Sequence, residues 1–198
     1  MVAVSSAAGG GKTTLVMKAG ELLGATTLFF DDYRDASSYP QDLNLWKTPK
    51  FAEDLAALKR GERIVSPVGG ATISPTEFIV IEEPMGRGRD EMATSVDFVV
   101  LIDTPLDIAM ARRFLRLADT NPLADIEQTT KEQLQEHVEG LLGFVTGELR
   151  NYLDGWRAVY IAVQEQVTAD CDLVLDGRLP PDELAEQLVE AVRLASAR

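Results

Sequence analysis

The residues with the clearest chemical potential lie close to the N-terminus. The segment Ser6–Thr14 reads Ser-Ala-Ala-Gly-Gly-Gly-Lys-Thr-Thr and separates an apolar stretch from a segment with helical spacing. Its end matches the phosphate-binding pattern G-x-x-x-x-G-K-[ST], whereas Ser6 stands where the first glycine is expected. Glycines let successive backbone N–H groups face one phosphate, and the following helix directs its positive end at the same anion. The segment therefore predicts a nucleoside-triphosphate site.

Each residue type in this segment has a role in such a site. Lys12 would reach the β- and γ-phosphates of ATP, and the hydroxyl of Thr13 would bind Mg²⁺. Further contacts to the nucleotide are expected from Gly9, Gly10, Gly11 and Thr14.

Carboxylates follow two further apolar stretches of the chain. Asp31 and Asp32 follow the stretch 26–30, and Glu82 follows the stretch 78–81. Ligands of open parallel sheets collect at the carboxyl ends of the strands. Glu82 is therefore a candidate for a second Mg²⁺-associated group, and Asp31 or Asp32 for a base that takes a proton from an acceptor hydroxyl. Carboxylates also close strands merely as turn formers, which is how we interpret Glu83 and Asp103.

Several short segments, in this order and spacing, resemble the uridine kinase and phosphoribulokinase branch of P-loop kinases. The matching segments are 9–14, 31–33, 58–61 with 66–68, 78–82, 99–105, 106–113 and 169–174. The resemblance implies a three-layer α/β/α P-loop fold with a mainly parallel central sheet and a helical lid. It also implies an enzyme that transfers the γ-phosphoryl group of ATP, with Mg²⁺, to a hydroxyl of a small molecule. Asp31 would be the base, because it holds the first position of the family's D-x-[FY] motif.

Three arginines lie within one predicted helix. Arg112 and Arg116 are four residues apart and share a helix face, with Arg113 beside them. The resemblance implies that they close over the triphosphate as part of a lid, at about residues 112–128. Arg112 and Arg116 would then act in catalysis and Arg113 in nucleotide binding. A solvated basic helix face is the alternative interpretation.

The chain departs from the family where the acceptor should bind. The stretch 117–121 lacks the second arginine pair of the family, and Lys47 follows Trp46 where uridine-binding members carry an aspartate. Residues 69–72 replace the tyrosine and histidine that contact the base in those members. Uridine is therefore a poor candidate acceptor, and Lys47 favours an anionic one. Acceptor contacts are expected from Asp32, Tyr33, Trp46, Lys47 and Arg87. Arg89 lies in the same glycine-containing loop as Arg87 and could contribute to the same site.

Two other functions remain open at this stage. A phosphate-binding loop also occurs in switch proteins and ATPases that act on a protein partner, although the chain has no obvious N-K-x-D guanine motif. The missing second arginine pair is also compatible with a degenerate kinase that binds nucleotide without transferring phosphate.

The elements that must position these residues alternate along the chain. Apolar runs that suit strands covered on both faces alternate with segments of helical spacing, which predicts an α/β sandwich. Trp156 and Tyr160 lie in the long helical stretch and are expected to pack within it, not to form a stacking platform. The expected strands are 1–4, 26–30, 78–81, 98–102 and 173–175, with a hairpin at 64–73; the expected helices are 12–23, 49–60, 105–117, about 129–163 with bends at its glycines, and one from Pro181.

Length and charge limit the protein's class. The 198 residues suit one domain, and 19 Lys and Arg against 32 Asp and Glu give a net charge of −13. Such a charge argues against broad binding of nucleic acid or of an anionic membrane. No apolar run approaches the roughly 18 residues that span a bilayer, and the N-terminus has no basic region, so we expect a cytoplasmic protein. Its partners would be ATP and a small hydroxylated acceptor, and a homo-oligomer is left open.

Overall fold

The computed structural model describes residues 1–34, 46–120 and 130–197. In chain order the elements are β1 (Val2–Ser5), α1 (Lys12–Leu23), β2 (Thr26–Leu28), a 3₁₀ turn (Phe30–Asp32), α2 (Pro49–Lys59), β3 (Ile64–Val65), β4 (Thr72–Ile73), β5 (Ile79–Glu82), α3 (Asp90–Ala93), β6 (Phe98–Asp103), α4 (Leu106–Thr120), α5 (Lys131–Asn151), a π-helical turn (Tyr152–Trp156), α6 (Arg157–Asp170), β7 (Leu173–Asp176) and α7 (Pro181–Ser196).

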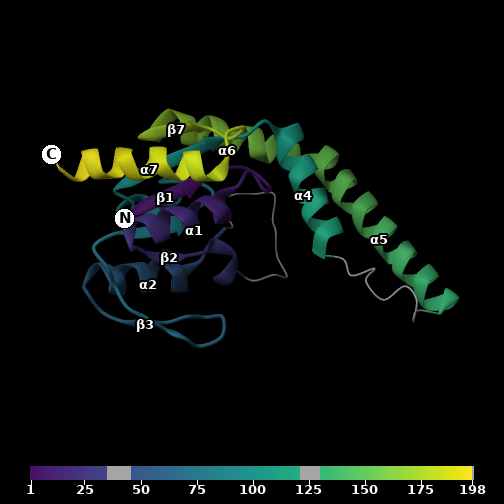
Figure 1. The fold of residues 1–198 in the computed structure, drawn as a ribbon, viewed down its shortest axis with the longest axis horizontal. Coiled ribbons are helices and arrows are strands. Elements are labelled where there is room, and N and C mark those ends of the chain that lie inside the picture. Colours follow the sequence, from purple (N-terminus) through teal and green to yellow (C-terminus); the bar gives the residue numbers. More distant parts are fainter. Residues whose placement is uncertain (35–45, 121–129, 198) are drawn as a thin grey trace.

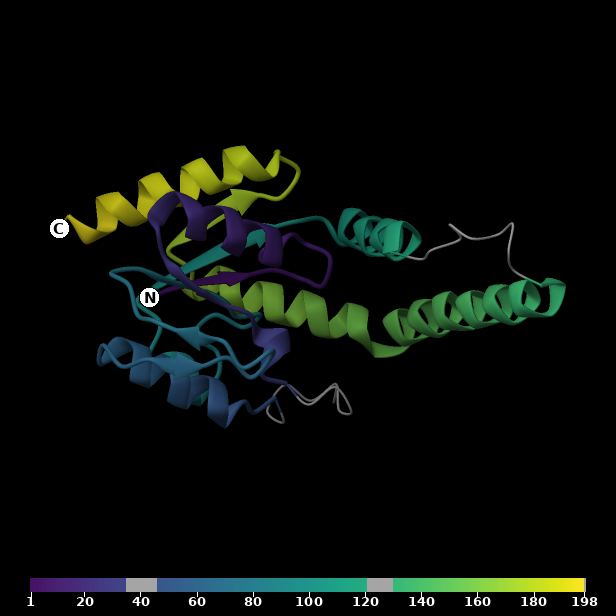
Figure 2. The same cartoon turned by 60° about the horizontal axis from the view of Figure 1, so that its bottom comes forward.

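The centre of the fold is a five-stranded sheet in the order β2-β5-β1-β6-β7. Every neighbouring pair in it is parallel; Ala3 of β1, for example, is in register with Ile81 of β5 and Val99 of β6. Helices cover both faces (Figures 1 and 2), so the predicted α/β/α architecture with a parallel sheet is confirmed. The predicted hairpin forms a separate antiparallel pair, β3 with β4.

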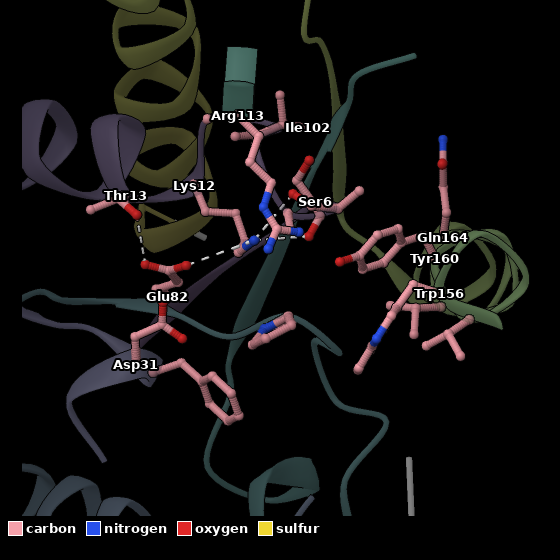
Figure 3. A pocket seen from close by; sticks show the side chains of 18 of the residues that line it. Ser6, Lys12, Thr13, Asp31, Glu82, Ile102, Arg113, Trp156, Tyr160 and Gln164 are labelled. Carbon is pink, nitrogen blue, oxygen red and sulfur yellow. Dashed lines mark hydrogen bonds and ion pairs between the residues drawn. The ribbon is translucent and has the colours of Figure 1, made fainter. Parts of the chain in front are cut away.

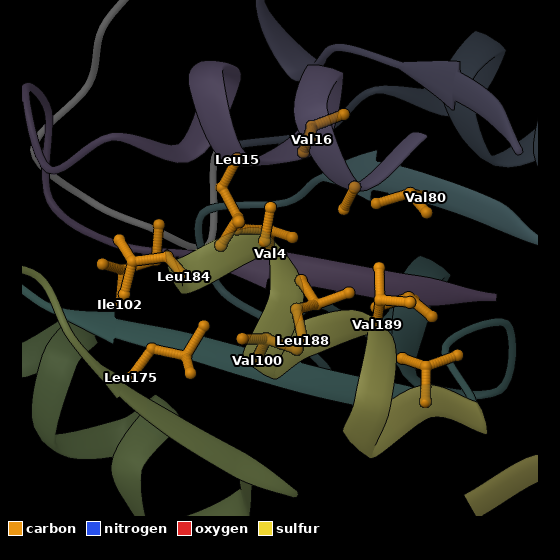
Figure 4. Packing of buried hydrophobic residues seen from close by; sticks show 14 residues of the cluster. Val4, Leu15, Val16, Val80, Val100, Ile102, Leu175, Leu184, Leu188 and Val189 are labelled. Carbon is orange, nitrogen blue, oxygen red and sulfur yellow. The ribbon is translucent and has the colours of Figure 1, made fainter. Parts of the chain in front are cut away.

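Two apolar cores hold the layers together. On one face α1 and α7 pack on the sheet (Figure 4), where Val4, Leu15 and Leu188 are buried. The other face is covered by α2, α3 and α6, with Phe51 and Val167 among its buried residues. Because β1 and its neighbours contribute apolar side chains to both cores, their strands read as continuous apolar runs.

The segment after β2 differs from its prediction. The strand ends at Leu28, and Phe30–Asp32 form a 3₁₀ turn in which Tyr33 N–H donates to the Phe30 carbonyl. This turn directs Phe30 into the core and carries Asp31 to the surface at the strand's carboxyl end.

The long helical stretch is divided at one place. The π-helical turn, which contains Gly155, separates α5 from α6, whereas Gly143 and Gly147 lie inside α5 without a break. In Figures 1 and 2, α4 and α5 extend away from the sheet, and α5 contains no buried residue. The helix predicted at 105–117 continues to Thr120 as α4, and residues 121–128 of the predicted lid lie outside the described residues. None of the described helices has the length and apolar character to cross a membrane.

Candidate active site

The loop between β1 and α1 has the backbone of a phosphate-binding loop. Gly9 has φ +84°, and a Cβ there would lie 2.1 Å from the carbonyl oxygen of Ala109 on α4. Gly11 has φ +104° and is the N-cap of α1. Positive φ values of this kind are available at little cost only to glycine. The glycines thus allow the chain to turn tightly under α4 and start α1, whose free N–H groups face the loop.

Ser6 replaces the first glycine of the pattern without disrupting the loop. Its side chain is buried, and its Oγ lies only 1.8 Å from where a Cβ on Gly10 would be. The hydroxyl of Ser6 therefore fills the space that the missing side chain of Gly10 leaves. The backbone still closes as a turn, because Gly10 N–H donates to the Ala7 carbonyl at 3.0 Å.

Thr104 anchors this loop from the end of β6. Its buried hydroxyl donates to the Gly10 carbonyl at 2.9 Å. Replacing it by the isosteric valine leaves a buried carbonyl without that donor, so we expect Thr104→Val to lower the free energy of unfolding by about 1–3 kcal/mol. Urea denaturation measures this loss. In the control Thr168→Val, the deleted hydroxyl is exposed on α6, and a loss as large as that of Thr104→Val would contradict the prediction.

Lys12 lies within the loop that it follows. Its Nζ donates to the carbonyls of Ser6 at 3.0 Å and Ala7 at 3.2 Å, and it lies 3.7 Å from Oε1 of Glu82. Burial lowers the pKa of Lys12, while the negative charges of Glu82 and Asp31 act in the opposite direction. The ammonium group is thus held by two backbone carbonyls at a position where phosphate oxygens could replace them.

The residues expected to hold Mg²⁺ lie next to each other. The hydroxyl of Thr13 at the start of α1 donates to Oε2 of Glu82 at the end of β5, at 2.9 Å (Figure 3). Mg²⁺ is bound in such sites through one or two protein oxygens, with substrate phosphates and water completing its shell. A hydroxyl and a carboxylate at this distance fit that donor set.

A cavity of about 580 Å³ opens beside the loop at the carboxyl ends of the strands. Of the residues predicted to bind nucleotide or metal, those that line it are Gly9, Gly11, Lys12, Thr13, Glu82 and Arg113, whereas Gly10 and Thr14 do not. Lys12 at the start of α1, Asp31 in the 3₁₀ turn after β2 and Glu82 at the end of β5 converge on it (Figure 3). The cavity is large enough for a small ligand and part of a nucleotide.

Asp31 lies at the edge of the cavity beside an arginine that the sequence analysis missed. Oδ1 of Asp31 accepts from Nε of Arg34 at 2.7 Å, and both residues line the cavity. The i, i+3 spacing of the two residues, across the 3₁₀ turn, was the available signal.

The opposite wall of the cavity is aromatic. Trp156 and Tyr160 point into it from the π-helical turn and from α6 (Figure 3), together with the predicted Trp46. Tyr160 and Trp156 also pack on each other, as expected, with ring centroids 5.8 Å apart. In addition, both rings line the cavity, which the sequence analysis did not predict. Their i, i+4 spacing beside Gly155 was the signal that the sequence analysis passed over.

The three arginines of α4 have different surroundings. Arg113 lines the cavity and is ion-paired with Glu148 of α5, and Arg116 also lines the cavity. Arg112 points elsewhere, because its Nη1 donates to the carbonyl of Gly177 beyond β7 at 2.9 Å. Arg113 and Arg116 therefore remain candidates for contacts to a triphosphate, and Arg112 holds α4 to the sheet.

Four predicted acceptor residues do not line the cavity. Arg87 binds Asp172 at 2.7 Å and three backbone carbonyls near the amino end of β6. Tyr33 packs against Phe51 of α2, at a centroid distance of 4.7 Å. The other two, Asp32 and Lys47, are outside the cavity lining, and Lys47 is exposed. Asp32 and Lys47 adjoin Asp31 and Trp46 in the sequence, but their side chains do not line the cavity.

Glu83 and Arg89 form a buried ion pair behind the site. Nη2 and Nε of Arg89 donate to the two carboxylate oxygens of Glu83 at 2.5 and 3.2 Å, and both side chains are almost fully buried. Arg89 also donates to the Trp46 carbonyl at 3.1 Å and lies over the ring of Phe30 at 5.1 Å. Glu83 is thus no simple turn former, and Arg89 is a support of the aromatic wall with no access to an acceptor.

Comparison with known proteins confirms the resemblance inferred from the motifs. No family model matches the chain. The chain is 27% identical to the uridine kinase of Borrelia duttonii (strain Ly) and 25% identical to that of Borreliella burgdorferi (strain ZS7). Each match covers 59% of this chain and 66% of the relative, so it spans slightly less than two thirds of those proteins.

Solved structures show the same fold at low sequence identity. A sugar kinase from Janibacter sp. HTCC2649 matches with a TM-score of 0.52 and 17% identity, over 99% of this chain and 95% of that one. A deoxyadenosine kinase from M. mycoides matches with a TM-score of 0.50 and 13% identity, over 97% and 98% of the two chains. The chain therefore resembles uridine kinases in sequence and P-loop kinases in fold.

Proposed function

We propose that this protein is a kinase that uses ATP and Mg²⁺ to phosphorylate a hydroxyl group of a small molecule. The observation that carries the proposal is the convergence of Lys12, Glu82 and Asp31 on one cavity from three separate elements of the fold. The similarity to uridine kinases supports it, because those proteins are named for the same class of reaction. We further propose that residues 1–198 act as one domain in the cytoplasm.

The nucleotide would lie over the loop 6–11, with its phosphates at the N-terminus of α1. Lys12 would contact the β- and γ-phosphates in place of its present carbonyl partners. Thr13 and Glu82 would hold Mg²⁺, which neutralises charge on the phosphate oxygens when bound. Arg113 and Arg116 would close on the phosphates from α4, as the described part of the lid at 112–128.

At the other side of the reacting phosphorus, Asp31 would orient the acceptor hydroxyl and receive its proton. The new bond joins that oxygen to the γ-phosphorus, and the bond to the β–γ bridging oxygen breaks, so that ADP leaves with the bridging oxygen. Asp31 suits this role because its carboxylate lies at the edge of the cavity and is close enough to Lys12 for their charges to interact. Lys12, Arg113 and Arg116 would stabilise the charge that develops on the transferring group.

An acceptor screen tests the proposal. The wild-type protein is incubated with ATP, Mg²⁺ and a panel of hydroxylated metabolites, and ADP release is compared with a control that lacks acceptor. We expect release that depends on the acceptor, together with a phosphorylated product by mass spectrometry. ADP release that ignores every acceptor but rises with a protein partner would support a switch or ATPase, and nucleotide binding without any turnover would support a degenerate kinase.

A further inference from the structure

The aromatic wall of the cavity consists of five rings, each of which packs against the next. Ring centroids are 5.9 Å apart for Trp46 and Trp156, 5.8 Å for Trp156 and Tyr160, and 5.9 Å for Phe30 and Trp46. Tyr152 continues the chain at 6.3 Å from Tyr160. All five line the cavity, which gives one end of it a continuous apolar surface.

This wall is held in place from behind. The buried Arg89 donates to the Trp46 carbonyl and lies over Phe30, and Glu83 fixes its guanidinium. A binding surface whose side chains are already held loses little entropy when a ligand arrives. The wall is therefore suited to recognition.

The charges near the wall do not favour an anionic acceptor. Arg34 is ion-paired with Asp31, Arg113 is ion-paired with Glu148, and both carboxylates line the same cavity. Lys47 and Arg87, which would have attracted an anion, lie outside it. A negative charge on the acceptor would lie near these two carboxylates, whose charges already balance those of Arg34 and Arg113.

The two indoles form a corner instead of a slot. They are tilted by 50° and already in contact at 5.9 Å. A planar aromatic base enclosed on both faces needs ring planes roughly 7 Å apart, twice the usual contact distance. The corner can cover one face of a ring, and the polar side chains Asp31, Asn151 and Gln164 line the same cavity.

Resting on the proposed kinase function, we propose that the acceptor is an uncharged sugar or cyclic polyol. Its apolar C–H face would stack on Trp46 and Trp156, and the hydroxyls on its rim would bind the polar groups of the cavity. One of these hydroxyls would face Asp31 and receive the phosphoryl group. A site that hydrogen-bonds ring hydroxyls rejects analogues that lack them, because its own polar groups would then be left unpaired.

The chain provides its own probe for this proposal. It contains two tryptophans, Trp46 and Trp156, and both line the cavity. Intrinsic fluorescence therefore reports on the aromatic wall without any turnover. The wild-type protein is titrated with neutral hexoses, pentoses and cyclitols, with nucleosides, and with carboxylated or phosphorylated sugars, each with and without a non-hydrolysable ATP analogue.

We expect a saturable fluorescence change with a neutral sugar or cyclitol. Trp156→Ala should weaken this binding about tenfold or more, read from Trp46, whereas Phe144→Ala removes an exposed aromatic ring of α5 outside the cavity and should leave it unchanged. Saturation only with nucleosides or only with anionic sugars, or with no compound, would overturn the proposal. Nucleotide affinity, measured separately with a fluorescent ATP analogue, shows whether the kinase proposal itself has failed.

Discussion

Replacing Lys12 by alanine is expected to reduce turnover by about 10²–10³-fold while the protein remains folded. The ammonium group lies within the phosphate-binding loop, held by two backbone carbonyls and 3.7 Å from Glu82. Transfer of a phosphoryl group increases charge on oxygens at this position, and no other described cation extends from the loop itself. The variant loses this stabilisation, whereas the cores that hold the sheet do not include Lys12.

The measurement is kcat/KM for ATP with the acceptor found in the screen, together with thermal unfolding followed by circular dichroism. The control is Lys18→Ala on the same helix, whose exposed ion pair with Asp182 contributes little to stability. Turnover at the wild-type rate in the Lys12 variant would refute the assignment of the site. A loss of the folded signal would show that Lys12 acts in structure.

The position of the phosphate-binding loop in the candidate site could be predicted from the sequence because its residues are local. Gly11, Lys12 and Thr13 are consecutive, so one loop and one helix N-terminus fix their relative positions. The same holds for the bounds of α1, which ends where Gly24 adopts a left-handed conformation. Glu82 was predictable for a similar reason, since a parallel strand leaves its last residue at the same edge of the sheet as the loop.

The acceptor end could not be predicted in this way because it depends on contacts distant in sequence. Trp46 meets Trp156 across more than a hundred residues, and nothing local in either segment indicates the other. Arg87 and Arg89 are two residues apart and alternate in direction, one toward Asp172 and one toward Glu83. A short spacing of basic residues therefore predicted a common site that the backbone does not form.

The arginines of α4 show the same limit on a helix. Arg112 and Arg116 share a face in the sequence pattern, yet Arg112 is bound to the Gly177 carbonyl, and it is Arg113 that lines the cavity with Arg116. The direction of a helix relative to the sheet decides which face meets the cavity, and periodicity alone does not contain that direction. The cavity that results carries charges of both signs, because Asp31, Glu82 and Glu148 line it beside the cations. An acidic protein thus surrounds a site of mixed charge.

Replacing Asp31 by asparagine is expected to lower kcat by about 10²–10⁴-fold with little loss of nucleotide affinity. Asparagine keeps the size of the side chain at the edge of the cavity but cannot take a proton from the acceptor hydroxyl. Asp31 also acts on Lys12 through its negative charge. Removing that charge makes the surroundings of Lys12 more positive, so the affinity for the negatively charged nucleotide should not fall. If Asp31 served only in its ion pair with Arg34, the variant would instead show a normal kcat and a nearly unchanged stability, because such exposed pairs contribute little.

Single-turnover kinetics with saturating ATP separate these outcomes, since they report the transfer step apart from binding and product release. The matched control is Asp182→Asn, which removes an exposed aspartate of α7 that pairs with Lys18 and does not line the cavity. If the Asp31 variant transfers phosphate at the wild-type rate, the acceptor hydroxyl is deprotonated elsewhere and the role of Asp31 is disproved. If it binds ATP normally but transfers slowly, the base lies at the end of β2, where the 3₁₀ turn carries it toward the hydroxyl of an acceptor stacked on the indoles.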